Sequence, residues 1–260
     1  MARVRLDTLV VARGLAASRE RARALILAGG VRVAGRMVDK AGHLVPEDAA
    51  IDLVEPDHPY VGRGGVKLAH ALEVFGIDPA GRLALDIGAS TGGFTDVLLR
   101  AGAARVVALD VGHGQLDWSL RTDPRVVVLE RVNARTLTSD ALPPECRAVD
   151  LVTIDVSFIS LRLVLPAVSS IVRPGADVVA LVKPQFEAGR GEVGRKGLVR
   201  DPRIHARVVE EVRAVADRVG LARVAETPSP ITGAEGNREY FLHLRATGGG
   251  AERRELETRR

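Results

Sequence analysis

From residue 83 onward, short apolar runs alternate with amphipathic segments. The runs that predict strands are LALDIG (83–88), RVVALDV (105–111), RVVVLE (125–130), VDLVTIDV (149–156), DVVALVK (177–183), ARVAET (222–227) and EYFLHL (239–244). Strands that alternate with helical segments predict an α/β fold with a doubly wound parallel sheet. Residues 178–182 are apolar at every position, which is typical of a strand with both faces buried inside such a sheet.

The first 54 residues have a different pattern, and it predicts a small α+β unit. A short helix is expected from Arg5 to Ala12, and a second helix is expected to begin after Ser18 as N-cap and to end at Gly29-Gly30. VRV and RMV, joined by Ala34-Gly35, predict a hairpin. Residues 55–65 contain two prolines and three glycines and have no periodicity, so they are expected to form a linker.

Composition and charge narrow the class of protein. The 46% hydrophobic and 27% charged content is that of a globular chain, and no apolar run approaches the roughly 18 residues of a membrane span. Cys146 is the only cysteine, so a disulfide framework is excluded and a reducing cytoplasm is expected. Residues 1–40 contain nine basic and three acidic side chains, a net charge of +6, whereas the whole chain carries +4. The charge concentrated at the front of the chain predicts a module that binds a polyanion.

The N-terminal unit resembles the S-four-type RNA-binding domain. The residues that carry the resemblance, in chain order, are RLD (5–7), GL (14–15), SR (18–19), Ala22, Ile26, Gly30, Val31, Val33 and Gly35. The resemblance implies an RNA partner. The side chains then expected to contact phosphates are Arg3, Arg5, Arg19, Arg23, Arg36 and Lys40. A surface basic face with no RNA role is the alternative.

A small-residue turn after the first strand of the sheet predicts a cofactor site. LDIGASTGGFTDVLL (85–99) has glycines where backbone and ligand must approach closely, although its spacing departs from the G-x-G-x-x-G pattern. Asp110 ends the second strand, where a carboxylate is the expected partner of a cofactor ribose. Together these features resemble the S-adenosylmethionine-dependent methyltransferases. The resemblance implies S-adenosyl-L-methionine as cofactor, held by Asp86, Gly88, Ser90, Thr91, Gly92, Gly93, Phe94, Asp110 and Asn133; for Asn133 a role confined to the turn remains open.

Four charged residues are expected to surround the reacting group. Lys183 and Asp155 follow apolar strands at the sheet edge where open α/β folds keep their binding crevices. With Lys67 and Glu239 they resemble the Lys-Asp-Lys-Glu tetrad of the ribose 2′-O-methyltransferases related to FtsJ. A ribose hydroxyl must lose its proton as it is methylated, and an ammonium with an ordinary pKa of about 10.4 cannot accept that proton. Burial or nearby positive charge would lower the pKa of a lysine, whereas Asp155 and Glu239 would act in the opposite direction. The two acids are therefore expected mainly to orient the lysines, with Lys183 as the base.

The whole chain resembles the TlyA, or haemolysin A-like, family of ribosomal RNA 2′-O-methyltransferases. The matching segments are YVGRGGVKL (60–68), LVKPQFEAGRGEVGRKGLVRDPRIH (181–205) and SPITGAEGNREYFL (229–242); Gly62 stands where the family has serine. The resemblance implies a Rossmann-like methyltransferase sheet behind an N-terminal RNA-binding domain. It divides the chain into residues 1–54, the linker 55–65, the methyltransferase domain 66–246 and a flexible tail 247–260.

The family resemblance also implies an activity and its setting. The expected reaction is methylation of cytidine ribose in ribosomal RNA of the small or large subunit, in the cytoplasm, with no membrane and no metal, and linked to capreomycin-type antibiotic susceptibility. Two alternatives belong to other classes of protein. One is a ribosome-binding factor without catalysis, and the other is a haemolysin, for which no amphipathic or membrane-spanning element is evident.

Overall fold

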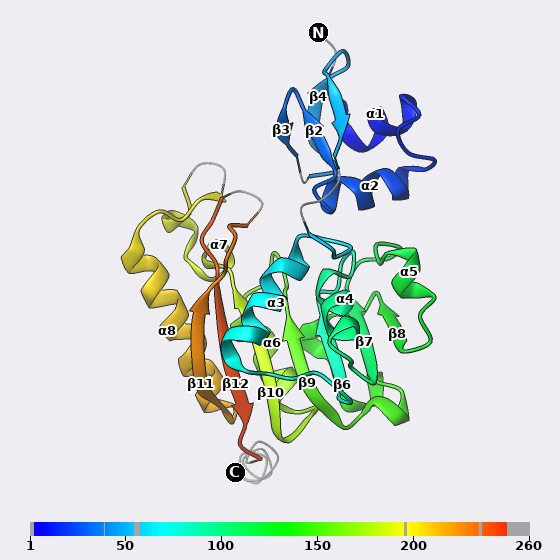
Figure 1. Cartoon of the computed structure of the whole chain (residues 1–260). Coiled ribbons are helices and arrows are strands. Elements are labelled where there is room, and N and C mark those ends of the chain that lie inside the picture. The colour runs from blue at the N-terminus through cyan, green and yellow to red at the C-terminus, as the bar shows by residue number, and fades with distance from the viewer. Residues whose placement is uncertain (1–2, 39, 55–57, 195–196, 234–235, 249–260) are drawn as a thin grey trace.

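The computed structural model describes residues 3–38, 40–54, 58–194, 197–233 and 236–248 of the chain. Figure 1 shows a small N-terminal lobe above a larger lobe built around one twisted sheet. The small lobe consists of β1 (Arg3–Arg5), α1 (Leu6–Ala12), α2 (Arg19–Leu27), β2 (Val31–Val33), β3 (Arg36–Met37), β4 (Leu44–Pro46) and β5 (Ile51–Leu53).

The helices and the hairpin expected in the small lobe are confirmed. The backbone N–H of Arg21 donates to Ser18 Oγ over 3.2 Å, so Ser18 caps α2. Ala34 and Gly35 have φ values of 49° and 74°, the conformation that a tight two-residue hairpin turn between β2 and β3 requires. β2 pairs with β3 and β5, and β1 pairs with β4. Their core is a cluster of buried apolar side chains from both helices and from β2 and β4.

The large lobe contains the remaining elements. Its helices are α3 (Gly64–Phe75), α4 (Gly93–Arg100), α5 (Trp118–Arg121), α6 (Leu161–Ser169), α7 (Pro184–Glu187) and α8 (Pro202–Arg218), with 3-10 turns η1 (Ala134–Thr136), η2 (Ser139–Ala141), η3 (Pro144–Cys146) and η4 (Arg190–Glu192). Its strands are β6 (Leu83–Ile87), β7 (Arg105–Asp110), β8 (Val126–Glu130), β9 (Val149–Ile154), β10 (Val172–Val182), β11 (Leu221–Pro228) and β12 (Tyr240–Ala246). α3 begins at Gly64, inside the segment expected to be linker.

The seven strands form one sheet in the order β11-β12-β10-β9-β6-β7-β8. The five strands from β10 to β8 pair in parallel, as expected. The parallel arrangement that the sequence predicts does not extend to β12, which runs antiparallel to both β10 and β11. Among the described residues between β11 and β12, no helix occurs. A connection that carries no crossover helix returns the chain in the opposite direction.

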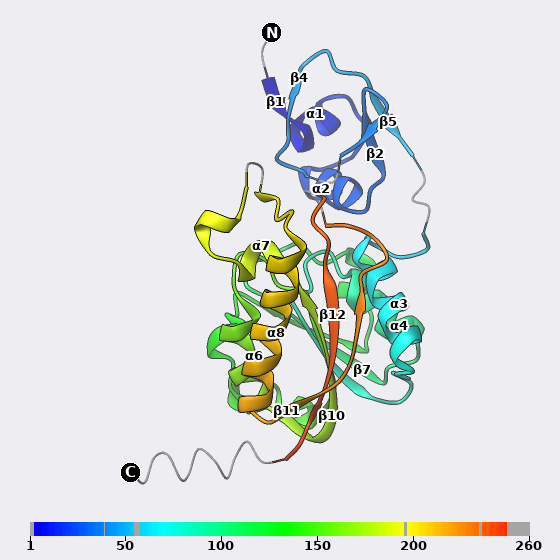
Figure 2. The same cartoon turned by 90° about the vertical axis from the view of Figure 1, so that its left-hand side faces the viewer.

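Helices cover both faces of this sheet, so the core has two halves. α3 and α4 lie on one face and α6 and α8 on the other, as Figure 2 shows. Along β10, Val178, Ala180 and Val182 belong to the α6–α8 side, whereas Val179 and Leu181 belong to the α3–α4 side. Burial on both faces explains why residues 178–182 are apolar without alternation, and it fixes where β10 ends and Lys183 emerges.

The small lobe lies over the sheet edge at which β9 and β10 end (Figures 1 and 2). Leu27 and Lys40 of the small lobe line the same cavity as Asp155 and Lys183. Across the lobes, Arg21 Nη1 lies 3.8 Å from Asp117 Oδ2. In the described part of the chain, no helix combines the length and apolar character needed to cross a membrane.

Candidate functional site

The ends of β9 and β10 bring two charged residues into contact. The Nζ atom of Lys183 lies 2.6 Å from Asp155 Oδ1 and donates to Ser157 Oγ over 3.0 Å. The two strands are parallel neighbours with Val179 opposite Thr153 and Ala180 opposite Ile154. Because the carboxyl ends of parallel neighbours meet at one edge, residues far apart in sequence form this pair.

Lys67 and Glu239 form the second half of the site. Lys67 comes from the first turn of α3, and Glu239 directly precedes β12. Lys67 Nζ donates to Glu239 Oε2 over 2.6 Å, and both side chains are almost fully buried. Separating the two partners of a buried ion pair is strongly destabilising, because it leaves each buried charge uncompensated. The pair therefore holds α3 and the start of β12 in one arrangement.

All four residues line one cavity of about 850 Å³. Burial tends to raise the pKa of Asp155, but the positive charges of Lys183 and Lys67 outweigh it and hold that pKa below the usual range. Asp155 is therefore a carboxylate at neutral pH. The cavity is thus lined by two lysines, Lys67 and Lys183, and by two acidic residues, Asp155 and Glu239.

The turn between β6 and α4 touches this cavity. Gly88 has a φ of +86°, and a Cβ on it would lie 2.4 Å from the backbone oxygen of Asp155. A side chain at this position would therefore collide with the backbone of Asp155, directly after β9. Gly88 and Ser90 line both the large cavity and an adjacent one of about 550 Å³, and Thr91, Gly93 and Phe94 line a smaller recess beside them.

The 550 Å³ cavity has the chemistry of an adenosine site. Its lining includes the apolar Leu109, Val111, Val132 and Ile159 and the carboxylate of Asp110. Asp110 accepts backbone N–H groups of Ser90 over 2.8 Å and of Gly112 over 2.6 Å, which fixes its orientation beside the turn. Apolar walls with one oriented carboxylate suit a flat base and a ribose, so these residues fit an S-adenosylmethionine-type cofactor.

Asn133 both lines this cavity and stabilises its own turn. Its Oδ1 accepts the backbone N–H of Arg135 over 3.0 Å, which caps η1. The turn role that the sequence left open is therefore present. A contact with the adenine remains a prediction.

Two residues expected at the cofactor line none of these three cavities. Asp86 is fully buried, and its carboxylate accepts the hydroxyls of Thr95 over 2.7 Å and Thr153 over 3.0 Å. Burial raises its pKa to about 7, against the effect of these two hydroxyls. Gly92 has a φ of +100°, and a Cβ on it would lie 2.2 Å from Leu120 Cδ1. The geometry gives both residues packing contacts beneath the turn, and a contact of either with the cofactor stays a prediction.

The basic residues of the small lobe divide into two groups. Arg23, Arg36 and Lys40 are exposed, and Arg3 is exposed while donating to the backbone oxygen of Leu44 over 3.2 Å. Arg5 and Arg19 are also exposed, but each binds the fully buried Asp7, at 2.8 and 3.0 Å. Burial tends to raise the pKa of Asp7, but the two arginines outweigh it and lower that pKa to about 2. Arg5 and Arg19 therefore have a structural role that the sequence pattern did not reveal.

The structure adds site residues that sequence reasoning missed. Phe158 is 92% exposed, has a φ of +66°, and lies at the rim of both large cavities. Its ring centroid is 5.1 Å from that of Phe186. Phe186 lies on α7, the short helix that begins directly after Lys183. Ser157, the partner of Lys183, lies beside Phe158. For Ser157 and Phe158 the only signal in the sequence was their position shortly after Asp155, and for Phe186 it was its position shortly after Lys183. No group of His, Cys, Asp or Glu that could hold a metal ion occurs among the described residues.

Comparisons with known proteins agree with this geometry. Residues 60–246 match the FtsJ-like methyltransferase family, and residues 4–51 match the S4 domain. The 16S/23S rRNA (cytidine-2′-O)-methyltransferase TlyA of Mycobacterium tuberculosis is 53% identical over 244 residues, covering 94% of this chain and 90% of its own. Hemolysin A of Brachyspira hyodysenteriae is 41% identical over 241 residues, covering 93% of this chain and 99% of its own.

A solved structure extends the similarity to three dimensions. The protein named "Putative hemolysin from Streptococcus thermophilus" superposes with a TM-score of 0.74 at 44% identity, covering 95% of this chain and 90% of its own. The match spans both lobes of the chain, so the similarity includes the small lobe as well as the sheet.

Proposed function

The chain belongs to the TlyA family, with an S4 domain followed by an FtsJ-like methyltransferase domain, and from this premise we propose that it methylates the 2′-hydroxyl of cytidine ribose in ribosomal RNA. The relative from Mycobacterium tuberculosis is named for this reaction on 16S and 23S rRNA. The proposed cofactor is S-adenosylmethionine, and the proposed substrate is a ribosomal subunit in the cytoplasm.

One observation carries the proposal. The cavity that holds Lys67, Asp155, Lys183 and Glu239 shares Gly88, Ser90 and Asp155 with the cavity that suits adenosine. A cofactor bound beside Asp110 would therefore present its reactive end to the lysines. A hydroxyl that enters the larger cavity would meet that end at the same place, which is the proximity that methyl transfer requires.

The residues of the site divide the chemistry between them. Lys183 lines the cavity that the ribose hydroxyl would enter, and we assign proton removal to it. Asp155 orients Lys183, and Lys67 stabilises the negative charge that develops on the hydroxyl oxygen. Glu239 holds Lys67 through its 2.6 Å bond. When bound, S-adenosylmethionine supplies an electrophilic methyl group attached to a positively charged sulfur.

The rim of the cavity suits a nucleobase. Phe158 and Phe186 form a tilted aromatic pair directly above Lys183, with Lys183 Nζ 6.0 Å from the centroid of the Phe186 ring. An exposed aromatic ring is a stacking surface for an unpaired base. A nucleotide turned out of the RNA would thus place its base on Phe158 and its ribose hydroxyl near Lys183.

Transfer of a radiolabelled methyl group from S-adenosylmethionine to purified ribosomal subunits tests the proposal. We expect label in ribosomal RNA, at a cytidine whose 2′-oxygen has become resistant to alkaline cleavage. Subunits that lack the modification should be used, with fully modified subunits as the control. A pure, folded protein that binds subunits but transfers no methyl group to them would be the non-catalytic ribosome-binding factor instead.

The small lobe should bind RNA through its exposed arginines, and Arg23 and Arg19 provide a matched pair. Arg23→Ala should weaken RNA binding and reduce its salt dependence by about one unit of slope without changing the melting temperature, because Arg23 is exposed on α2. Arg19→Ala should also destabilise the lobe, by about 1–2 kcal/mol, because it removes a charged hydrogen bond from the buried Asp7.

Acid titration of the same two variants provides the check. The folded pKa of Asp7, about 2 against an ordinary 3.8, lies below the unfolded value. The stability contributed by its pairing is therefore fully present above about pH 4 and is lost as pH falls towards 2. Arg19→Ala should show a smaller loss of stability than wild type in this window. An Arg19→Ala protein with wild-type stability at pH 7 would contradict the structural role of this pair.

A further inference from the structure

A buried carboxylate joins the two loops that carry Lys183 and Asp155. Glu187 lies on α7, four residues after Lys183, and is 4% exposed. Its Oε2 accepts the hydroxyl of Ser160 over 2.5 Å, and its Oε1 accepts the backbone N–H of Leu161 over 2.7 Å. Ser160 comes five residues after Asp155. One side chain of the Lys183 loop (183–192) therefore binds the base of the Asp155 loop (155–160).

Arg162 completes this connection from the other side. Its Nε lies 3.3 Å from Glu187 Oε2, and its Nη2 donates to the backbone oxygen of Glu187 over 2.9 Å. Ser160 is also the N-cap of α6 and accepts the backbone N–H of Arg162. The carboxylate thus lies at the N-terminus of a buried helix, where negative charge is stabilised.

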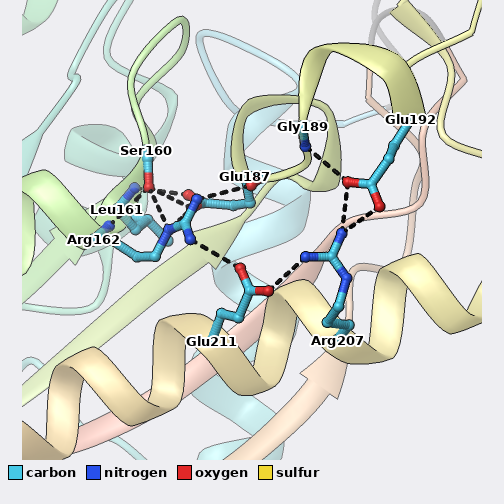
Figure 3. Close-up of polar contacts among 8 residues, drawn as sticks. All are labelled: Ser160, Leu161, Arg162, Glu187, Gly189, Glu192, Arg207 and Glu211. Atoms are coloured by element: carbon cyan, nitrogen blue, oxygen red, sulfur yellow. Dashed lines mark hydrogen bonds and ion pairs between the residues drawn. The ribbon is translucent and has the colours of Figure 1, made fainter.

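The network continues to α8, as Figure 3 shows. Arg162 Nη1 donates to Glu211 over 2.8 Å, and Glu211 also binds Arg207. Arg207 Nη2 binds both oxygens of Glu192, whose Oε2 accepts the backbone N–H of Gly189 over 2.8 Å. We call these eight residues the Glu187 brace: Ser160, Leu161, Arg162, Glu187, Gly189, Glu192, Arg207 and Glu211. Its inner end is buried and its outer end, at Glu192, is exposed.

None of the eight residues lines the cavity that holds the four catalytic residues. Nevertheless, the brace joins the Lys183 loop and the Asp155 loop close to the two catalytic positions, because Glu187 comes only four residues after Lys183 and Ser160 only five residues after Asp155. The two loops also carry the aromatic pair Phe158 and Phe186. A change in the distance between the two loops would therefore move the base-stacking rings and the Lys183–Asp155 pair together.

We propose that Glu187 is a positioning residue for methyl transfer, which sets the spacing between the Asp155 loop and the Lys183 loop. This inference rests on the proposed function. Burial raises the pKa of Glu187 against the hydrogen bonds from Ser160 and Leu161 and the charge of Arg162, so the protein keeps a carboxyl group here at an energetic cost. A residue needed only to fill space would not require buried polar partners.

Single-turnover methylation at saturating S-adenosylmethionine and subunits separates positioning from binding. Glu187→Ala should lower the rate about 10²-fold, because misplacement of reacting groups by about 1 Å costs this much. The dissociation constants for the cofactor and for the subunits should stay within about twofold of wild type. Glu187→Gln should keep most of the rate, because its amide oxygen still accepts the N–H of Leu161. Glu210→Ala removes an exposed carboxylate of α8 that lies outside the brace; it is the matched control and should keep the wild-type rate.

Ser160→Ala tests the same contact from the other loop and guards against misfolding of Glu187→Ala. It should lower the rate about tenfold, and the double variant should be no slower than Glu187→Ala alone, because the Ser160–Glu187 hydrogen bond is already absent from Glu187→Ala. A folded Glu187→Ala or Ser160→Ala protein with a rate within about twofold of wild type would overturn the inference. So would an equal loss in Glu210→Ala. Wild-type protein that transfers no methyl group to subunits would instead overturn the proposed function, and the inference with it.

Discussion

Lys183→Ala is expected to lower the single-turnover rate by about 10²–10⁴-fold, the range for removal of a general base, while cofactor and subunit binding persist. Lys183 lies within 2.6 Å of Asp155 and within 3.0 Å of Ser157, at the end of a strand buried on both faces. Its amine therefore has little freedom, and its loss leaves no other amine at the same position. The measurement is the methylation rate with both substrates saturating.

Lys183→Arg distinguishes proton removal from electrostatic anchoring. Guanidinium keeps its proton throughout the accessible pH range, so the arginine variant should remain as inactive as alanine although it restores the charge beside Asp155. The wild-type rate should rise with pH, since a general base accepts a proton only in its unprotonated form. A folded Lys183→Arg enzyme with a near-normal rate would show that Lys183 acts only through its charge.

Asp110→Ala is expected to weaken S-adenosylmethionine binding by about 1.5–3 kcal/mol, or roughly 10- to 150-fold, the value of a lost charge-assisted hydrogen bond. Asp110 lines the adenosine-sized cavity, with its carboxylate oriented by the N–H groups of Ser90 and Gly112. Calorimetric titration of the folded variant gives the affinity directly.

Two controls separate ribose binding from support of the turn. Ser90 and Gly112 donate to different oxygens of Asp110. Asp110→Asn keeps the acceptor for one of these two N–H groups, so it should disturb the turn less than Asp110→Ala while still losing affinity. Asp123→Ala removes a surface carboxylate that pairs with Arg125, and it should leave the affinity within about twofold of wild type. Unchanged affinity in Asp110→Ala would remove Asp110 from the cofactor site.

Much of the fold and part of the candidate site followed from local patterns in the sequence. An apolar run with no alternation predicts a strand buried on both faces, and residues 178–182 form the end of β10 in the middle of the sheet. The carboxyl ends of parallel strands share one edge, so the positions of Lys183 and Asp155 after their strands were enough to expect them together. Ser18 as N-cap and Ala34-Gly35 as a turn were predictable because capping and left-handed backbone depend on nearby residues alone.

Other features were decided only by contacts between distant segments. Glu239 pairs with Lys67 across 172 residues of chain, and the family resemblance, not the pattern of the sequence, placed them in one site. The reversed direction of β12 depends on its pairing with both β10 and β11. Arg5 and Arg19 form ion pairs with Asp7 because its buried carboxylate needs positively charged partners. Sequence patterns report local backbone preference and burial, whereas which charge meets which partner depends on how the packed elements bring distant side chains together.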